Sequence, residues 1–146
     1  MFKERINNFI TDHVIKNCIS TNNNWIFMLF SVVTVGIVQS NVLFSFFFSD
    51  DFLHLYQICN WPALEFIFSS HGGHLYITRN LIFLVMYKLF GMNATYYFIV
   101  VLMTHLISTS ILFILIKYIT KNSLIAVACS TIWGISPVNY FTLHWY

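Results

Sequence analysis

Hydrophobic residues run almost unbroken over three stretches of the chain, and polar residues collect between them. A helix that crosses a bilayer needs about 20 mostly apolar residues. The first stretch, 25–48, carries no charge, and the second, 95–116, contains a single ionisable residue, His105. The third stretch, 123–136, is the shortest. The pattern predicts an all-α integral membrane protein with about three transmembrane helices.

The segment 49–94, between the first two predicted spans, is too apolar for an ordinary solvated loop. Pro62 divides its first half, and proline suits the first turn of a helix but not the interior. We therefore expect two short helices, at about 50–59 and 62–69, with a break between them.

The second half of this segment begins with a turn signal, Ser69 to Gly73, which contains two adjacent glycines. A helix is predicted from Leu75 to Phe90, where Gly91 provides a C-terminal cap. Arg79 and Lys88 fall inside this helix, so we expect it to lie in the membrane interface rather than to cross the bilayer.

The composition supports a membrane protein: 58% of residues are hydrophobic, 19% aromatic and 8% charged, with a mean hydropathy of +0.74. An average soluble domain has roughly 25% charged residues. These values exclude a soluble enzyme domain, a disordered tail and a basic nucleic-acid-binding protein. The net charge of +2 is too small to attract nucleic acid, so no such partner is expected.

The positive charges predict the orientation, because Lys and Arg collect on the cytoplasmic side of membranes. Five of the seven lie beside span ends that face the same side: Lys3, Arg5, Lys16, Lys117 and Lys121. We expect a multi-pass protein, of a bacterial cytoplasmic membrane, with a cytoplasmic arm at 1–24. The segments 49–94 and 137–146 would then lie outside. The first apolar core exceeds the about 7–15 residues of a cleaved signal, which favours a retained anchor.

An acidic pair, Asp50 and Asp51, directly follows the first predicted span. Adjacent carboxylates repel each other, which raises one pKa and suits a general base. Alternatively, aspartate is a preferred residue at a helix N-terminus, where it caps the free N–H groups. His54 lies four residues after Asp50 and three after Asp51, so in a helix it is on the same face as both carboxylates. We treat both aspartates as candidate catalytic residues and His54 as a candidate substrate-binding residue.

His71, His74 and Arg79 form a second set of candidate substrate-binding residues. A guanidinium group at the outer membrane surface can bind a lipid-linked phosphate through paired hydrogen bonds. The alternative is that Arg79 simply extends to the lipid headgroups. Two histidines are too few to hold a metal ion, so no metal or other cofactor is expected, with a divalent cation near the carboxylates as the weaker alternative.

His105 lies in the middle of the second predicted span, where an ionisable residue is costly and is often functional. The other interpretation is a neutral histidine that bonds a nearby hydroxyl group, such as that of Ser108 or Thr109. The cysteines are expected to lie in different compartments and form no C-x-x-C motif, which argues against a disulfide or a thiolate zinc site.

The order of these features resembles the start of a membrane glycosyltransferase of the GT-C superfamily, which includes protein O-mannosyltransferases and aminoarabinose transferases. In that family the first span brings an acidic pair to the outer face, matched here by Asp50–Asp51. A loop of interfacial helices follows, with a histidine-containing turn and a basic residue, matched by 71–74 and Arg79. The corner at 89–91 and the intramembrane His105 also have counterparts.

The resemblance implies a partial GT-C fold and the N-terminal part of a longer enzyme. Such an enzyme transfers a sugar with inversion from a polyprenyl-phosphate donor to an acceptor at the outer face. An aspartate of the pair would be the general base, and Arg79 would hold the phosphate. The implied partners are the lipid-linked donor, membrane lipid and the rest of the enzyme. Two alternatives stay open: a non-catalytic three-span protein that binds a membrane partner, and a transporter fragment with His105 in a proton path.

Overall fold

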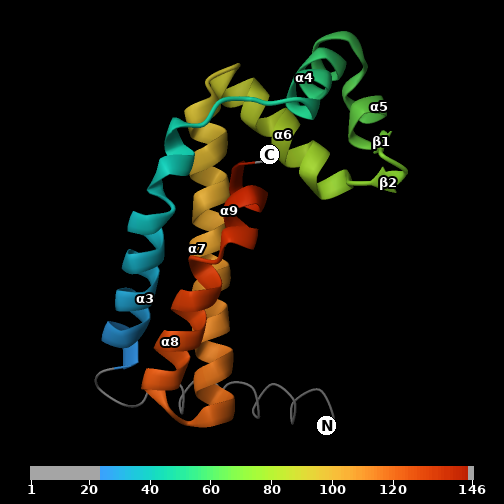
Figure 1. Cartoon of the computed structure of the whole chain (residues 1–146). Coiled ribbons are helices and arrows are strands. Elements are labelled where there is room, and N and C mark those ends of the chain that lie inside the picture. Colours follow the sequence, from blue (N-terminus) through green and yellow to red (C-terminus); the bar gives the residue numbers. More distant parts are fainter. Residues whose placement is uncertain (1–23, 145–146) are drawn as a thin grey trace, which may run out of the picture. The chain divides into compact units, whose positions relative to one another are not determined.

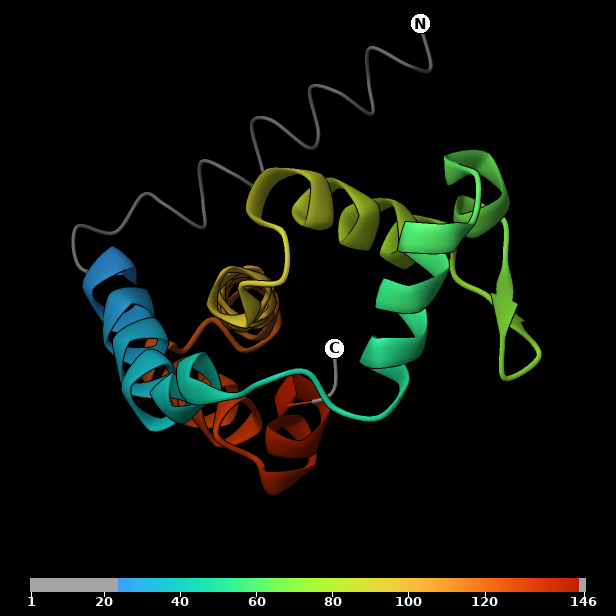
Figure 2. The same cartoon turned by 90° about the horizontal axis from the view of Figure 1, so that it is seen from above.

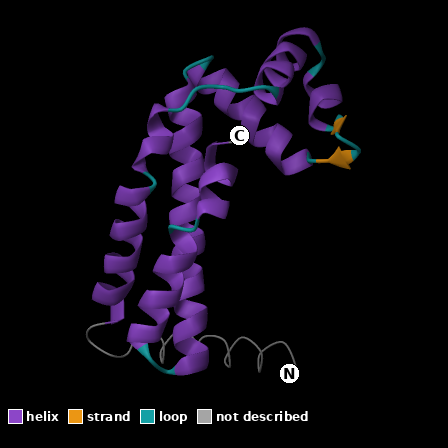
Figure 3. Ribbon diagram, in the orientation of Figure 1, coloured by secondary structure: helices purple, strands orange, loops and turns teal. Residues whose placement is uncertain are grey.

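The computed structural model describes residues 24–144, and this part of the chain is mostly helical, as predicted (Figure 3). The predicted arm at 1–24 lies outside the described residues except for Asn24. In chain order the elements are α3 (Asn24–Val38), the 3-10 helix η2 (Ser40–Phe44), α4 (Asp50–Asn60), α5 (Ala63–Ile67), β1 (Ser70–His71), β2 (His74–Leu75), α6 (Ile77–Phe90), α7 (Ala94–Thr120), α8 (Ser123–Gly134) and α9 (Pro137–His144).

The described residues divide into two compact units. Unit 1 comprises 24–40 and 102–141, and unit 2 comprises 41–101 and 142–144. Helix α7 therefore begins in unit 2 and continues through unit 1.

Helix α7 has 27 residues and extends beyond both ends of the predicted second span, 95–116. Within the part of the chain that the structure describes, it is the one helix long and apolar enough to cross a membrane. Its last turn carries Lys117, whose Nζ donates to the Ser123 hydroxyl at 2.6 Å and the Lys121 carbonyl at 3.3 Å. Cationic groups are favourable at a helix C-terminus, so this charge stabilises the end of α7.

The prediction of one continuous apolar helix over 25–48 is wrong. Helix α3 ends at Val38, and η2 and an extended segment follow. At about 1.5 Å per residue its 15 residues cover about 22 Å, less than the ~30 Å of a bilayer core. Ser40 Oγ donates to the Ile37 carbonyl at 2.8 Å, and the Gln39 amide donates to the Gly134 carbonyl at 2.9 Å. Such side-chain bonds compete with the helix and locate its end.

The third predicted span, 123–136, corresponds to α8, which has 12 residues and ends at Gly134. Its N-terminus is capped by Asn122, whose Oδ1 accepts from the backbone N–H groups of Leu124 and Ile125 at 2.9 and 3.4 Å. A new helix, α9, begins at Pro137. Helix α8 thus ends two residues before the predicted span does, and alone it is shorter than a membrane span.

In unit 1, α3 and α8 lie side by side along the length of α7 that belongs to this unit (Figures 1 and 2). Small polar side chains join α3 to α8: Ser31 and Ser130 lie 2.9 Å apart between hydroxyl oxygens, and Thr131 donates to Ser31 at 2.9 Å. Gly134 packs directly against Val35. Small residues let helix backbones approach closely, and each buried hydroxyl finds a partner within the pair.

In unit 2 the two expected short helices are present as α4 and α5, separated at Trp61 and Pro62. Helix α5 ends at Ile67, two residues earlier than predicted. A small β-hairpin replaces the expected turn at 69–73: β1 pairs with β2, and only Gly72 and Gly73, with φ angles of 57° and 81°, form the turn between the strands. These left-handed angles favour glycine.

Helix α6 begins at Ile77 rather than at Leu75, because the hairpin takes up the residues before it. Gly91 ends α6 with a φ of 59°, and its N–H donates to the Tyr87 carbonyl at 2.8 Å, as predicted for a C-terminal cap. The core of unit 2 is aromatic and includes the buried residues Phe47, Phe66, Phe83 and Tyr97. The Tyr97 ring lies 5.0 Å from that of Phe47 and 5.2 Å from that of Phe83, between ring centroids.

Candidate functional site

Helices α4 and α6 of unit 2 bring together residues that the sequence analysis assigned to two separate motifs. His54 is buried on α4, and Arg79 lies half-buried in the first turn of α6. Arg79 Nη2 donates to His54 Nε2 at 2.7 Å, a short bond for a nitrogen pair. The His54 Nδ1 atom lies 3.3 Å from Oε1 of Gln57, which is also buried.

The two aspartates of the acidic pair have different environments. Asp51 is fully buried, and its Oδ2 accepts from the Phe48 backbone N–H at 2.9 Å. This bond connects the first turn of α4 to the residue that precedes its N-cap, Ser49, where no side-chain cap hydrogen bond is made, so the capping interpretation is not confirmed. The other oxygen, Oδ1, is buried and has no hydrogen-bond partner among the described residues. Asp50 is half-buried, and its Oδ1 accepts from the Ser49 hydroxyl at 3.3 Å.

Burial raises the pKa of Asp51 above its ordinary value, because a charged carboxylate is poorly solvated inside the fold. The Phe48 N–H acts against this rise, the negative charge of Asp50 adds to it, and the positive charge of Arg79 opposes it. The Asp51 carboxyl group therefore holds its proton to a higher pH than an ordinary aspartate does.

Ser49, the residue before the pair, has a φ of 49°, in the left-handed region that few residues other than glycine adopt. Such a conformation costs about 1–3 kcal/mol and persists where the surrounding structure imposes it. The chain is therefore held in a strained conformation at the point where the two carboxyl groups begin.

The side chains that Arg79 contacts directly are not acidic, although its charge also acts on Asp51. Besides His54, its Nη2 lies 3.4 Å from Asn80 Oδ1, and its guanidinium carbon lies 4.8 Å from the centre of the Tyr76 ring. A cation over an aromatic face is attracted by the ring quadrupole. None of the contacts that Arg79 makes with the described residues is an ion pair with a carboxylate.

Asn80, Gln57 and Tyr76 belong to this site but were not predicted. The buried Asn80 donates from Nδ2 to three carbonyls at the end of α5, at 3.1, 3.3 and 3.2 Å: those of Phe66, Ile67 and Ser69. It thereby fixes the start of α6 against α5. The sequence could have pointed to Asn80, because it is a polar residue next to Arg79 within an apolar run. It could also have pointed to Gln57, which lies one helical turn from His54.

The two remaining candidates lie in the hairpin. His74 is exposed, and its ring centroid lies 5.7 Å from that of Tyr76, so it connects to Arg79 only through that ring. The side chain of His71 lies outside the part that the structure describes. Among the described residues, no three His, Cys, Asp or Glu side chains are grouped closely enough to hold a metal ion.

His105, in unit 1, is buried and bonds a carbonyl group rather than a hydroxyl group. Its Nε2 lies 2.9 Å from the Gly134 carbonyl oxygen, and its ring stacks on Trp133 at 5.1 Å between centroids. The hydroxyls of Ser108 and Thr109 donate instead to carbonyls of α7. A bond to one of these hydroxyls was one of the two interpretations, and the structure shows a carbonyl partner instead, through which His105 joins α7 to α8.

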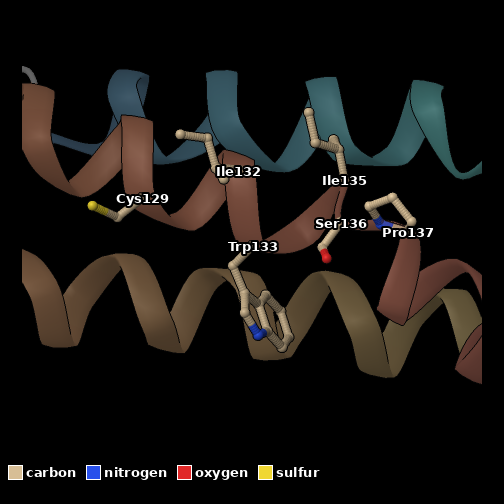
Figure 4. A pocket seen from close by; sticks show the side chains of 6 residues that line it. All are labelled: Cys129, Ile132, Trp133, Ile135, Ser136 and Pro137. Atoms are coloured by element: carbon tan, nitrogen blue, oxygen red, sulfur yellow. The ribbon is translucent and has the colours of Figure 1, made fainter.

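An open cavity of about 660 Å³ lies in unit 1, along α8 and the start of α9 (Figure 4). Its lining is mostly apolar and consists of Cys129, Ile132, Trp133, Ile135, Ser136 and Pro137. It includes none of the predicted site residues. Comparison of the chain with protein-family models, curated proteins and solved structures gives no match.

Proposed function

We propose that this chain is the N-terminal part of a membrane glycosyltransferase that takes a sugar from a polyprenyl-phosphate donor at the outer membrane face. The observation that carries the proposal is the half-buried Arg79 guanidinium, which contacts no carboxylate directly and whose charge acts on Asp51 of the acidic pair. The resemblance in motif order supports the same reaction.

A partly desolvated charge is costly unless a group of opposite charge compensates for it. His54, Asn80 and Tyr76 orient Arg79 without neutralising it. Its remaining N–H groups form a planar donor set that matches a phosphate in two parallel hydrogen bonds. An anionic phosphodiester is therefore the ligand that this arrangement best accommodates.

The acidic pair would supply the base. Asp50 is the more exposed member, so we assign it the proton transfer, whereas Asp51 is buried and positions the start of α4. The Asp50 carboxylate takes the proton of the acceptor hydroxyl, and the acceptor oxygen bonds to the anomeric carbon of the sugar. The bond from that carbon to the phosphate oxygen breaks, and the lipid phosphate leaves with the electron pair. A positioned general base typically contributes about 10²–10⁴-fold to such a reaction.

The reaction requires a membrane, and the outer surface of α7 suits one. Large apolar side chains are exposed along it, among them Met103, Ile107, Ile111 and Ile119. Apolar surface on this scale is usually covered by protein or lipid. We propose that α7 crosses the bilayer with α3 and α8 as further membrane segments, and that unit 2 lies at the outer face.

The test is binding of a short donor analogue, citronellyl methyl phosphate, to the full chain in dodecyl maltoside micelles. Arg79→Gln removes the proposed phosphate ligand, and Lys88→Gln removes the same charge from the exposed far end of the same helix. We expect Arg79→Gln to weaken binding about tenfold or more, as for loss of a charged hydrogen bond, and Lys88→Gln to leave it unchanged.

Equal binding by the wild type and Arg79→Gln would refute the phosphate site. The catalytic step is tested separately, in the longest reading frame that includes this chain, by sugar transfer from a polyprenyl-phosphate donor. Wild-type rates in both Asp50→Asn and Asp51→Asn would remove the base from the proposal.

A further inference from the structure

We infer that the exposed rings of Tyr76 and His74 bind the sugar of the lipid-linked donor, and that they hold a pyranose through a ring face that consists of C–H groups. The inference rests on the proposed function, because the sugar is attached to the phosphate that Arg79 would bind. It identifies the residues that contact the transferred group.

The hairpin and the start of α6 bring both rings next to Arg79. Figure 1 shows that β2, which contains His74, leads into α6; Tyr76 directly precedes this helix, and Arg79 lies in its first turn. The Tyr76 ring centroid lies 5.7 Å from that of His74 and 4.8 Å from the Arg79 guanidinium carbon. The Tyr76 carbonyl accepts from the Asn80 N–H at 2.9 Å, which ties the backbone of Tyr76 to α6.

The contacts of Arg79 leave one exposed neighbour beside it. Among the described residues, the side chains that contact the guanidinium are those of His54, Asn80 and Tyr76. His54 and Asn80 are buried, whereas Tyr76 is 42% exposed. In a glycosyl phosphodiester a single oxygen atom joins the phosphorus to the anomeric carbon, so the sugar must lie directly beside the bound phosphate. The Tyr76 ring is therefore the neighbour of Arg79 that the sugar can reach.

The two rings match the chemistry of a pyranose. The face of an aromatic ring is negative, and the C–H groups of a sugar carry partial positive charge because oxygen atoms are bonded to their carbons. At their edges the rings have polar groups, the Tyr76 hydroxyl and the His74 nitrogens, which can bond sugar hydroxyls. The structure gives these polar groups no hydrogen-bond partner among the described residues. A sugar can therefore use both the faces and the edges of the rings.

The isoprenoid chain, the other group on the phosphate, matches the rings less well. It is apolar and has no group that could bond the Tyr76 hydroxyl or the His74 nitrogens. A chain lying over these rings would remove water from their polar atoms without replacing its hydrogen bonds, which is costly. The sugar hydroxyls replace those bonds, so the chemistry of the two rings favours the sugar over the lipid chain.

The experiment compares two probes that share a citronellyl chain and a phosphate: citronellyl methyl phosphate and citronellyl β-D-glucosyl phosphate. All hydroxyl groups of the β-D-glucosyl ring are equatorial, so both faces of its ring consist of C–H groups. Binding to the full chain is measured in micelles of lauryldimethylamine oxide, a detergent without sugar or phosphate. The sugar preference is the ratio of the affinity for the glucosyl probe to that for the methyl probe. We expect a sugar preference of about fivefold in the wild type.

The variants separate the rings from the rest of the site. Tyr76→Leu should abolish the sugar preference, and Tyr76→Phe, which keeps the ring, should retain part of it. His74→Leu should lower the preference but leave the affinity for the methyl probe unchanged, because His74 does not contact Arg79 directly. Tyr56→Leu is the matched control, since Tyr56 is an exposed tyrosine of α4 that makes none of the described contacts with Arg79.

Equal binding of both probes by the wild type would overturn the inference, while the phosphate site stands if Arg79→Gln still loses binding of the methyl probe. The inference is also wrong if Tyr76→Leu weakens both probes in equal proportion, because the ring would then contact the lipid or only orient Arg79. Loss of the preference in Tyr56→Leu as well would contradict a specific role for Tyr76. Absence of binding of either probe by the wild type would refute both proposals.

Discussion

A methyl group added at Gly134 would collide with the neighbouring helix. A Cβ atom there would collide with one γ-carbon of Val35, which is fully buried, and would lie 3.0 Å from the other and 3.3 Å from the Thr109 hydroxyl oxygen. Overpacking of this kind costs about 1–3 kcal/mol. The Gly134 carbonyl also accepts from Gln39 and bonds His105, so separation of the helices weakens two hydrogen bonds of about 1 kcal/mol each.

We therefore expect Gly134→Ala to lower the free energy of unfolding by about 2 kcal/mol or more. The assay is SDS titration of the full chain in dodecyl maltoside micelles, followed by circular dichroism. Gly36→Ala is the matched control, because a Cβ at that position in α3 would meet only Leu106 side-chain atoms at 3.8 Å. Its stability should equal or exceed that of the wild type, since alanine favours a helix interior by up to about 1 kcal/mol over glycine.

A second comparison tests the cause of the loss. Val35→Ala removes both γ-carbons that the new methyl group would meet. It should therefore lower the free energy of unfolding less in the Gly134→Ala background than in the wild type. Neighbouring residues show coupling energies of about 0.5–3 kcal/mol in such cycles. If Gly134→Ala and Gly36→Ala unfold at the same SDS fraction, or if the two changes at 134 and 35 are additive, the close packing of α3 on α8 is refuted.

Three further predictions concern unit 2. Asn80→Ala leaves carbonyl groups at the end of α5 without their donor and should cost about 1–3 kcal/mol in the same unfolding assay, and an unchanged stability would contradict the role of Asn80. Burial raises the pKa of Asp51 in the folded state above its ordinary value of 3.8. The neutral Asp51 therefore contributes its full share to the free energy of unfolding below pH 3.8, and this contribution is lost as the pH rises through the raised pKa. Asp51→Asn should remove this part of the pH dependence, whereas parallel stability curves would oppose the assignment. The exposed Cys59 of α4, in a Cys18→Ser, Cys129→Ser background, should react with a membrane-impermeant maleimide in intact cells, and reaction only after permeabilisation would place unit 2 on the inner side.

The sequence predicted the elements whose ends depend on a single residue. Pro62 cannot sit in a helix interior, and it separates α4 from α5. Gly72, Gly73 and Gly91 adopt the left-handed φ angles that the expected turn and the expected helix end require. In each of these cases the covalent structure of one residue restricts the backbone locally, so no information about distant partners was needed.

Features that depend on distant partners were missed. The end of α3 at Val38 involves a hydrogen bond from Gln39 to a carbonyl 95 residues further along the chain. Helical spacing placed His54 on the face of the acidic pair, but it could not show that Arg79, 25 residues away, would bond the ring. The hydroxyl partner suggested for His105 was not found for the same reason, because the carbonyl group that its ring nitrogen contacts belongs to another helix, α8.

The buried polar groups of the two units differ in how completely they are hydrogen-bonded. In unit 1 the buried Ser31, Gln39 and His105 each bond another group of the same unit, so their polarity serves helix packing. In unit 2 the Asp51 Oδ1 atom has no partner among the described residues, and none of the side chains that Arg79 contacts there is a carboxylate. Buried polar groups in native proteins are nearly always satisfied, so the exceptions require a cause. The phosphate ligand proposed above would bring a negative charge to Arg79, and protonation of Asp51, which its raised pKa favours, reduces the cost of the unpaired oxygen.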